Sequence, residues 1–427
     1  MKINHRRALS GGLVATLAVA ALAGCASSPG EASDTVKVTL ANHPWNDATQ
    51  EWISEFEEDS GLKVELTSYS ETQLLDQYNV KLNAGSTDID VMMYQPVVVG
   101  QLFADNRWLA DLSDYVDSSA EWDWDDFQES ARSTVTFDEA VYGVPLTAET
   151  EVLYYRKDLL EKAGLEVPQT MEELASAVET VAAQNPDVNG FVARGARSAA
   201  VSQFSSFLYS FGADWQDGDT ATVDSDEAIE AYEFYGSMIR DFGPDGATSM
   251  GWPEAMALFT QGMAAFYPES SALYTNAVDA DSSTVADNVG FAPFPEGPDG
   301  AKPYNVPAWA LGVNEASTNK DNAWKFIEWM TSKQRVLDLQ EAGIAGSRQS
   351  AWDDPQGVAG FPSDLVDAMR IGQANGIGHY FPAVAKIGEA RDIIGDPIVA
   401  AIDGKDVREA AEKANAKLQK LLDDSNR

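Results

Sequence analysis

Strand-like and helix-like hydrophobic patterns alternate at the start of the folded part of this chain, which restricts the possible folds more than any other feature. Residues 36–40 alternate as a strand does, and residues 62–66 and 89–94 repeat the signal. The apolar residues with helical spacing between them are Trp52, Ile53 and Phe56 in the first interval and Leu74, Tyr78 and Leu82 in the second. This order predicts a parallel sheet, the beginning of an α/β lobe.

The middle of the chain predicts a crossing into a second lobe. Two extended runs, 141–146 and 151–155, are joined by a short polar link, and Thr170 with Glu173 can form a capping box at the start of a helix. Further helices are predicted at 157–162, 201–211, 226–242 and 254–261, and strands at 264–267 and 289–292. The run 308–313 predicts a return to the first lobe, followed by helices from Asn319, from Lys333 and in a tail to Leu422.

The N-terminus has the layout of an export signal over residues 1–24, with three basic residues ahead of the apolar run 11–23. The run is shorter than the ~20 residues that span a bilayer. It ends in Leu22-Ala23-Gly24-Cys25, which resembles a bacterial lipobox. The resemblance implies lipidation of Cys25, a linker over 25–35, and a protein held at the outer face of the cell membrane by lipid alone. An ordinary secretory signal is the alternative, and Sec or twin-arginine export is left open.

Cysteine content and charge exclude several kinds of chemistry. Cys25 is the only cysteine, so neither an intramolecular disulfide nor a Cys-ligated metal in the core is possible. The formal net charge of -39 disfavours nucleic acid and anionic lipid headgroups, and the dispersed acids indicate a solvated surface. The loop with Asp214, Asp217 and Asp219 lacks EF-hand spacing and is interpreted as a solvated turn. Neither a metal nor a cofactor is expected.

Length predicts two lobes, since about 400 mature residues exceed what one hydrophobic core usually organises. The first lobe is expected to comprise residues 36–146 with 309–350, and the second lobe residues 151–305. Residues 351–427 are expected to form a helical C-terminal segment that packs on the lobes.

Four landmarks together resemble the extracellular solute-binding proteins of the maltose-binding type that feed ABC importers. They are the lipobox; Tyr142-Gly143-Val144-Pro145 followed by residues 153–159 and 162–165; residues 261–266; and residues 309–313 before 322–326. The match covers nearly the whole mature chain, although Gln261-Gly262-Met263 lacks the Lys that the family often has beside the Gly. That position is not expected to touch ligand.

The resemblance implies a type II periplasmic-binding-protein fold, in which each lobe has a mixed, mostly parallel sheet flanked by helices. A hinge of crossing strands joins the lobes, and a ligand is held between them. The implied partners are the permease subunits of an ABC transporter, and the protein is expected to be a monomer.

A carbohydrate site needs flat aromatic surfaces beside groups that donate and accept hydrogen bonds. Aromatic residues in loops at the ends of predicted elements are Trp45, Tyr94, Trp215, Trp252, Tyr267 and Trp309. His43 and Gln95 share the loops after the first and third predicted strands, where ligands of open α/β sheets bind. Burial in a core is the alternative for each aromatic residue, and Trp324 and Trp329 are assigned to the core.

Polar candidates for ligand contact lie near the predicted crossings, at positions that in the family commonly face the ligand. They are Glu149 and Thr150 in the link, Glu269 and Ser270 after a strand, and Arg348 after a glycine-punctuated loop. Arg348 could bind vicinal hydroxyls or form a salt bridge in this acidic protein, and Glu149 could instead pair with Arg156. A structural role is the preferred interpretation for His379.

These features predict a binding protein, not an enzyme, that captures a monosaccharide, oligosaccharide or polyol and closes over it. Residues 346–350, with Glu149 and Thr150, slightly favour a polyol or monosaccharide over a long maltodextrin, and phosphate esters rank last. One alternative is a secreted glycoside hydrolase that uses two of Glu149, Glu151 and Glu269 as its carboxylate pair. Another is a structural or adhesive lipoprotein.

Overall fold

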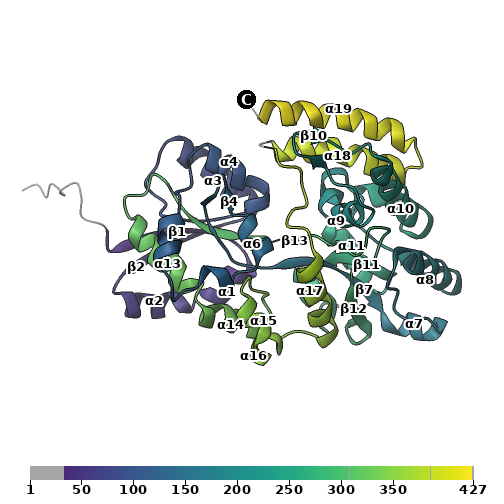
Figure 1. Ribbon diagram of the computed structural model, residues 1–427. Helices are drawn as coiled ribbons and strands as arrows, with labels where there is room; N and C mark the ends of the chain where they lie inside the picture. Colours follow the sequence, from purple (N-terminus) through teal and green to yellow (C-terminus); the bar gives the residue numbers. More distant parts are fainter. Residues whose placement is uncertain (1–32, 307, 385, 426–427) are drawn as a thin grey trace, which may run out of the picture.

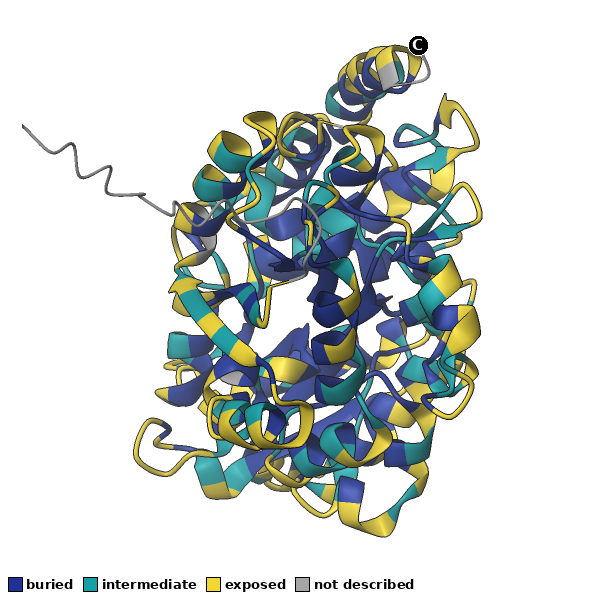
Figure 2. Ribbon diagram, turned by 90° about the vertical axis from the view of Figure 1, so that its left-hand side faces the viewer, coloured by how far each residue is buried: buried dark blue, intermediate teal, exposed yellow. Residues whose placement is uncertain are grey.

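Two lobes lie side by side in the computed structural model, which describes residues 33–306, 308–384 and 386–425 (Figure 1). Each lobe has its own cluster of buried apolar side chains around its own sheet. Buried residues occupy the interior, and exposed residues gather on the outer helices and loops (Figure 2). Over these residues, no helix combines the length and apolar character needed to cross a membrane. The predicted signal segment and Cys25 lie outside the described residues.

The sheet of the first lobe has the strand order β2-β1-β3-β14-β6. Its strands are β1 (Thr35–Ala41), β2 (Lys63–Tyr69), β3 (Val91–Tyr94), β6 (Val144–Pro145) and β14 (Ala310–Val313). β1 runs parallel to β2 and β3, whereas β14 is antiparallel to β3 and β6. The predicted helices between the first strands are confirmed as α2 (Trp52–Ser60) and α3 (Glu71–Asn83), and α3 buries Leu74, Tyr78 and Leu82.

Short helices and a hairpin complete the first lobe. They are α1 (Pro44–Thr49), the π-helix η1 (Pro96–Gly100), α4 (Gln101–Asp105), α5 (Ser113–Ser118), η2 (Trp124–Asp126), α6 (Glu129–Ser133), β4 (Thr136–Phe137), β5 (Ala140–Val141), α13 (Lys320–Met330) and α14 (Lys333–Glu341). α15 (Gln349–Asp353) and α16 (Pro355–Val358) contact α14. As predicted, Trp324 is buried, whereas Trp329 is only partly buried.

The sheet of the second lobe has the order β12-β7-β11-β8, with β13 on one end of β7. Its strands are β7 (Glu149–Arg156), β8 (Asn189–Phe191), β11 (Ala264–Ser270), β12 (Val289–Pro293) and β13 (Asn305–Val306). Only β8 and β11 pair in parallel; β7 is antiparallel to β11, β12 and β13. The predicted mixed sheet is confirmed, but it is mainly antiparallel rather than mostly parallel. The chain enters along β7, and the strands beside β7 run back toward the first lobe.

Helices pack on this sheet and on one another. They are α7 (Lys157–Ala163), α8 (Met171–Gln184), α9 (Arg197–Ser210), α10 (Asp226–Phe242), α11 (Trp252–Thr260), α12 (Tyr274–Val278), α17 (Ser363–Asn375), α18 (Ile387–Ile402) and α19 (Val407–Ser425). Smaller elements are β9 (Gln216–Asp217), β10 (Thr220–Ala221), η3 (Ala247–Ser249), η4 (Ser271–Leu273) and η5 (Ala286–Asn288). The predicted capping box at Thr170 and Glu173 is present at α8. α17 packs on β7 and β12, and α18 packs against α9, α10 and α19.

The segments that cross between the lobes hydrogen-bond to one another. The Leu146 N–H donates to the Trp309 carbonyl over 2.9 Å, and the Ala148 N–H donates to the Ala345 carbonyl over 3.0 Å. Thr147 and Gly346 form an antiparallel bridge between these contacts. The crossing segments therefore make the hinge of extended chain that the resemblance implied.

Candidate functional site

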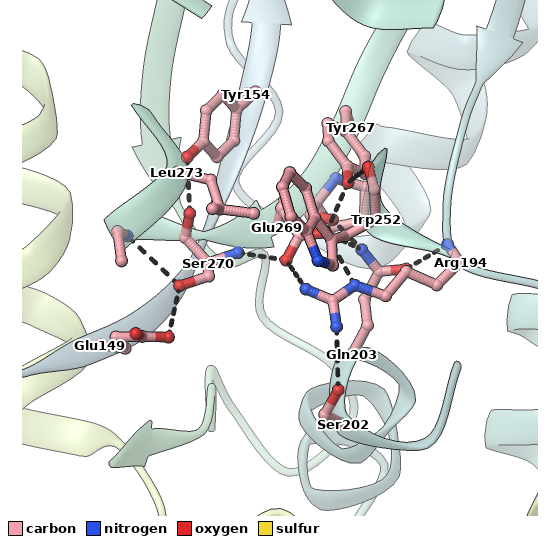
Figure 3. Close-up of polar contacts among 12 residues, drawn as sticks. Glu149, Tyr154, Arg194, Ser202, Gln203, Trp252, Tyr267, Glu269, Ser270 and Leu273 are labelled. Carbon is pink, nitrogen blue, oxygen red and sulfur yellow. Dashed lines mark hydrogen bonds and ion pairs between the residues drawn. The ribbon is translucent and has the colours of Figure 1, made fainter. Parts of the chain in front are cut away.

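Polar side chains from three strands of the second lobe meet at the sheet edge next to the crossing. Glu149 begins β7 directly after the crossing, Ser270 ends β11, and Arg194 lies three residues beyond β8. β7 is antiparallel to β11, and β8 is parallel to β11. The start of β7 and the ends of β8 and β11 therefore lie at the same edge of the sheet. Figure 3 shows their side chains directed toward one another.

Arg194 and Glu269 form an ion pair with two contacts. Arg194 Nε donates to Glu269 Oε2 over 2.8 Å, and Nη2 contacts Oε1. The Glu269 side chain is fully buried, whereas that of Arg194 keeps 15% of its surface exposed. Burial opposes the charge of Arg194, but the carboxylate of Glu269 outweighs burial and holds the pKa of Arg194 well above its ordinary value. Arg194 is therefore charged, and Glu269 orients it.

The backbone of Arg194 is also fixed on both sides. Its N–H donates to Gln203 Oε1 over 2.6 Å, and the Tyr235 hydroxyl donates to its carbonyl over 2.7 Å. Arg194 Nη1 donates to Ser202 Oγ over 3.2 Å. A guanidinium has five N–H donors, and these side-chain contacts do not use all of them.

Glu149 supplies an acceptor beside this donor. The Ser270 hydroxyl donates to Glu149 Oε2 over 2.9 Å, and the other carboxylate oxygen has no hydrogen bond within the described residues. Burial raises the pKa of Glu149, with the Ser270 hydroxyl and the charge of Arg194 acting in the opposite direction. The predicted alternative, a pair with Arg156, is wrong because Arg156 pairs with Asp158 at the far end of β7.

Trp252 adds a flat apolar surface to these polar groups. Its backbone is tied to the cluster, because the Tyr267 hydroxyl, which also contacts Glu269, donates to the Trp252 carbonyl over 3.4 Å (Figure 3). Trp252 is 40% exposed, whereas the other predicted aromatic candidates are buried. An exposed indole beside a fixed guanidinium and a carboxylate can bind a molecule that has both C–H faces and hydroxyl groups.

In the first lobe the candidates His43 and Trp309 pack on each other, and the Trp309 carbonyl accepts the N–H of Leu146 at the crossing. Their ring centroids are 5.7 Å apart at an interplanar angle of 57°. His43 is the N-cap of α1, and its Nδ1 accepts the N–H of Trp45 over 3.1 Å. Burial lowers the pKa of His43 to about 4 despite the nearby Asp47, so the ring is neutral at neutral pH. Gln95 follows β3 and is partly buried.

Three aromatic residues predicted to contact ligand belong instead to the cores. Trp45, Tyr94 and Trp215 each expose no more than 1% of their surface. The Tyr94 hydroxyl donates to the Tyr142 carbonyl over 3.3 Å, and the Trp215 ring packs 6.0 Å from that of Phe204. Their positions at element ends misled the prediction, because the chain turns there and directs the rings inward. Trp309 is also largely buried, at 6% exposure, so its contact with His43 is its clearest link to the site.

Two polar candidates serve the fold rather than the site. The Thr150 hydroxyl is buried and donates to the Tyr304 carbonyl over 3.0 Å. Arg348 is fully buried, pairs with Asp126 over 3.0 Å and lies 4.0 Å above the ring of Phe127. The structure therefore confirms the salt-bridge alternative for Arg348 and contradicts the ligand-contact prediction. Buried strands and helices enclose both side chains, and sequence position alone could not reveal this.

Sequence reasoning missed Arg194, together with Ser202 and Gln203, which hold it in place. The signal was weak because β8 has only three residues, one of them Gly190, and does not read as a strand. A lone arginine after a short apolar run, 191–193, was the clue available in the sequence.

A separate cavity of about 510 Å³ lies between the lobes. Its lining is mainly apolar and includes Val97, Val98, Leu102, Phe137, Phe381 and Ile387, with none of the polar cluster around Arg194. His379 and Asp214, 3.1 Å apart, stand at its wall, and the side chains of both are partly exposed. The described part of the chain contains no group of three or more His, Cys, Asp or Glu residues that could hold a metal ion. The cavity suits hydroxyl groups less well than the cluster does.

Comparison with known proteins places this geometry in context. A family model described as bacterial extracellular solute-binding protein matches residues 42–335. The chain is 26% identical to the erythritol/L-threitol-binding protein of Mycolicibacterium smegmatis, over 75% of this chain and 71% of that protein. It is 29% identical to the mannitol-binding protein of Pseudomonas aeruginosa, over 74% of this chain and 71% of that protein.

Solved structures agree with the fold. An ABC transporter solute-binding protein from Agrobacterium radiobacter in complex with ribitol superposes with a TM-score of 0.77 at 27% identity, covering 91% of this chain and 98% of that one. Maltose-bound T. maritima MalE3 also superposes with a TM-score of 0.77, at 28% identity, covering 90% of this chain and 100% of that one.

Proposed function

Because this chain belongs to the family of bacterial extracellular solute-binding proteins, we propose that it captures a polyol or small sugar between its lobes and delivers it to an ABC transporter. Family membership identifies a binding protein rather than an enzyme, so the glycoside hydrolase alternative is discarded. Relatives named for erythritol and mannitol, and a similar structure solved in complex with ribitol, support the ligand class. The observation that carries the proposal is the fixed Arg194–Glu269 pair beside the exposed indole of Trp252.

Each part of a polyol has a matching group in this cluster. Hydroxyl oxygens accept from the free N–H groups of Arg194, and hydroxyl hydrogens are donated to Glu149. The C–H faces pack on the Trp252 ring. Phosphate esters fit poorly, because Glu269 already neutralises the guanidinium and Glu149 adds a carboxyl group next to it.

A small ligand fits better than a long oligosaccharide. A chain of sugar rings needs a series of aromatic platforms, whereas Trp252 alone among the aromatic candidates is substantially exposed. This supports an alditol or a monosaccharide, in line with the preference drawn from residues 346–350.

Binding is coupled to closure of the lobes in this proposal. His43 and Trp309 belong to the first lobe, and Glu149, Arg194 and Trp252 belong to the second. A ligand that contacts both groups favours the closed state, since only that state makes all the contacts.

Anchoring at the membrane is a further part of the proposal. Lipidation of Cys25 would hold the protein at the outer face of the cell membrane, where a monomer meets its ligand. Mass spectrometry of the N-terminal peptide checks the lipid, and light scattering of the soluble form checks the monomer. An unmodified Cys25, or a stable dimer, would contradict this part without affecting the ligand proposal.

A ligand screen tests the function directly. Thermal unfolding of soluble residues 26–427 is followed with erythritol, ribitol, D-mannitol, D-tagatose, maltose and maltotetraose. A ligand at 100 times its Kd stabilises the folded state by about 2.7 kcal/mol, which raises Tm visibly. We expect alditols to raise Tm most, with calorimetry giving one site per chain. No response to any of these compounds would contradict the proposal.

A further inference from the structure

We propose that His43 is a hydrogen-bond donor to the bound polyol, with the donor atom fixed by the cap that the same ring makes on α1. The inference rests on the proposed function and deepens it, because it assigns a defined chemical role to one residue of the first lobe.

The cap determines which nitrogen carries the proton. A neutral imidazole has one N–H and one acceptor nitrogen. His43 Nδ1 accepts the N–H of Trp45 over 3.1 Å, so Nδ1 is the acceptor and the proton is on Nε2. The Trp45 ring, buried in the core of the first lobe, anchors the donor of this bond. The tautomer is therefore set by the fold before any ligand arrives.

The surroundings of the ring leave Nε2 available. Over the described residues no hydrogen bond to Nε2 is present, and the side chain is only partly buried. Trp309 packs at 5.7 Å and holds the ring plane in place. His43 stands in the loop at the carboxyl end of β1, the edge at which ligands of parallel sheets bind. An N–H in such a place needs an acceptor, and a ligand hydroxyl oxygen supplies one.

Charge at His43 is suppressed at neutral pH. Burial lowers the pKa of His43 to about 4, and Asp47 on α1 is the charged group that acts on the ring in the opposite sense. Trp309, which packs on the ring from the other segment, carries no charge. The ring therefore presents one neutral donor from the first lobe, whereas Glu149 and Arg194 belong to the second lobe.

Two substitutions separate the cap from the donor. Asn is a strong N-cap residue, so His43→Asn keeps an acceptor for the Trp45 N–H, but its short side chain removes the Nε2 donor. His43→Ala removes both. Ribitol and D-mannitol serve as probes, with Tm for stability and calorimetry for affinity. We expect His43→Asn to keep the wild-type Tm and bind about tenfold more weakly, as one lost hydrogen bond implies. His43→Ala should lose affinity and also unfold at a lower temperature.

A spectroscopic measurement tests the tautomer itself. In protein labelled with ¹⁵N at histidine, Nδ1 of His43 should be unprotonated and Nε2 protonated, and the Nε2 resonance should shift on addition of D-mannitol. A proton on Nδ1, or wild-type affinity in His43→Asn, overturns the inference while the proposed function stands. If no probe stabilises the wild-type protein, the proposed function fails, and this inference fails with it.

Discussion

Glu269 holds Arg194 from a strand 75 residues further along the chain, through a contact of 2.8 Å between Oε2 and Nε and a second contact between Oε1 and Nη2. The pair ties β11 to the segment after β8 and fixes the guanidinium of the cluster at this edge of the second sheet. We propose that both the stability of the second lobe and the recognition of ligand depend on this pair.

Removing the charge of Glu269 alone should lower the unfolding free energy of the protein. Glu269→Gln leaves Arg194 charged and largely buried without its partner, and we expect a loss of about 3–5 kcal/mol in unfolding free energy. Urea denaturation followed by circular dichroism measures the loss. The double variant Arg194→Met/Glu269→Gln should be more stable than the sum of the single losses predicts. Purely additive effects would mean that the two side chains are not coupled.

Removal of the exposed indole should affect binding more than stability. Trp252→Ala removes a ring that is 40% exposed, so the unfolding free energy should change by less than about 1 kcal/mol, whereas affinity for ribitol or D-mannitol should fall at least about tenfold. Ile371→Ala is the matched control, since Ile371 is 41% exposed and lies on α17, away from the cluster. Equal affinities in the two variants would remove Trp252 from the site.

Arg348 should behave as a structural residue. Arg348→Lys cannot reproduce the bonds to Asp126 and to the Thr331 carbonyl or the stacking on Phe127, so we expect a loss of about 2–4 kcal/mol in unfolding free energy. Calorimetry on the folded variant below its transition should show wild-type affinity for D-mannitol. A large loss of affinity with unchanged stability would restore the ligand-contact role.

Glu151 should weaken the fold as pH rises. Burial raises its pKa well above the ordinary value, and the hydroxyl of Ser206 and the charge of Arg194, which act in the opposite direction, do not offset it. The folded state therefore keeps a proton that the unfolded chain releases above about pH 4.5, and stability falls as pH rises through this window. Glu151→Gln should flatten that slope in urea denaturation between about pH 5 and pH 8. An unchanged slope would show that Glu151 does not titrate in this way.

His43 should give the opposite dependence at acid pH. Its pKa is about 4 in the folded protein, below the value of 6.5 for a free side chain. The unfolded chain takes up the proton first, so this contribution to stability is present above about pH 6.5 and is lost as pH falls toward 4, by an amount on the order of 3 kcal/mol. In urea denaturation at about pH 7 and about pH 5, His43→Asn should lose less stability than the wild type. Identical losses would contradict the low pKa.

Local patterns were enough to predict most elements of this fold. The spacing of Leu74, Tyr78 and Leu82 identified α3 and its buried face, and Thr170 with Glu173 identified the start of α8. Such signals are local, because the residues that determine them are only a few positions apart. The strand directions in the second sheet could not be predicted from local patterns, because they depend on which strands lie beside β7.

The sequence by itself determined the order of strands and helices and the family resemblance, and it supplied Glu149 and Trp252 as candidates for the proposed site. Only the tertiary structure decided that Trp45, Tyr94 and Trp215 are core residues, that Arg348 pairs with Asp126, and that Arg194 is held by Glu269. The physical reason is that periodicity reports which face of an element is apolar. The partner of a polar or aromatic side chain is chosen by packing between segments far apart in the chain.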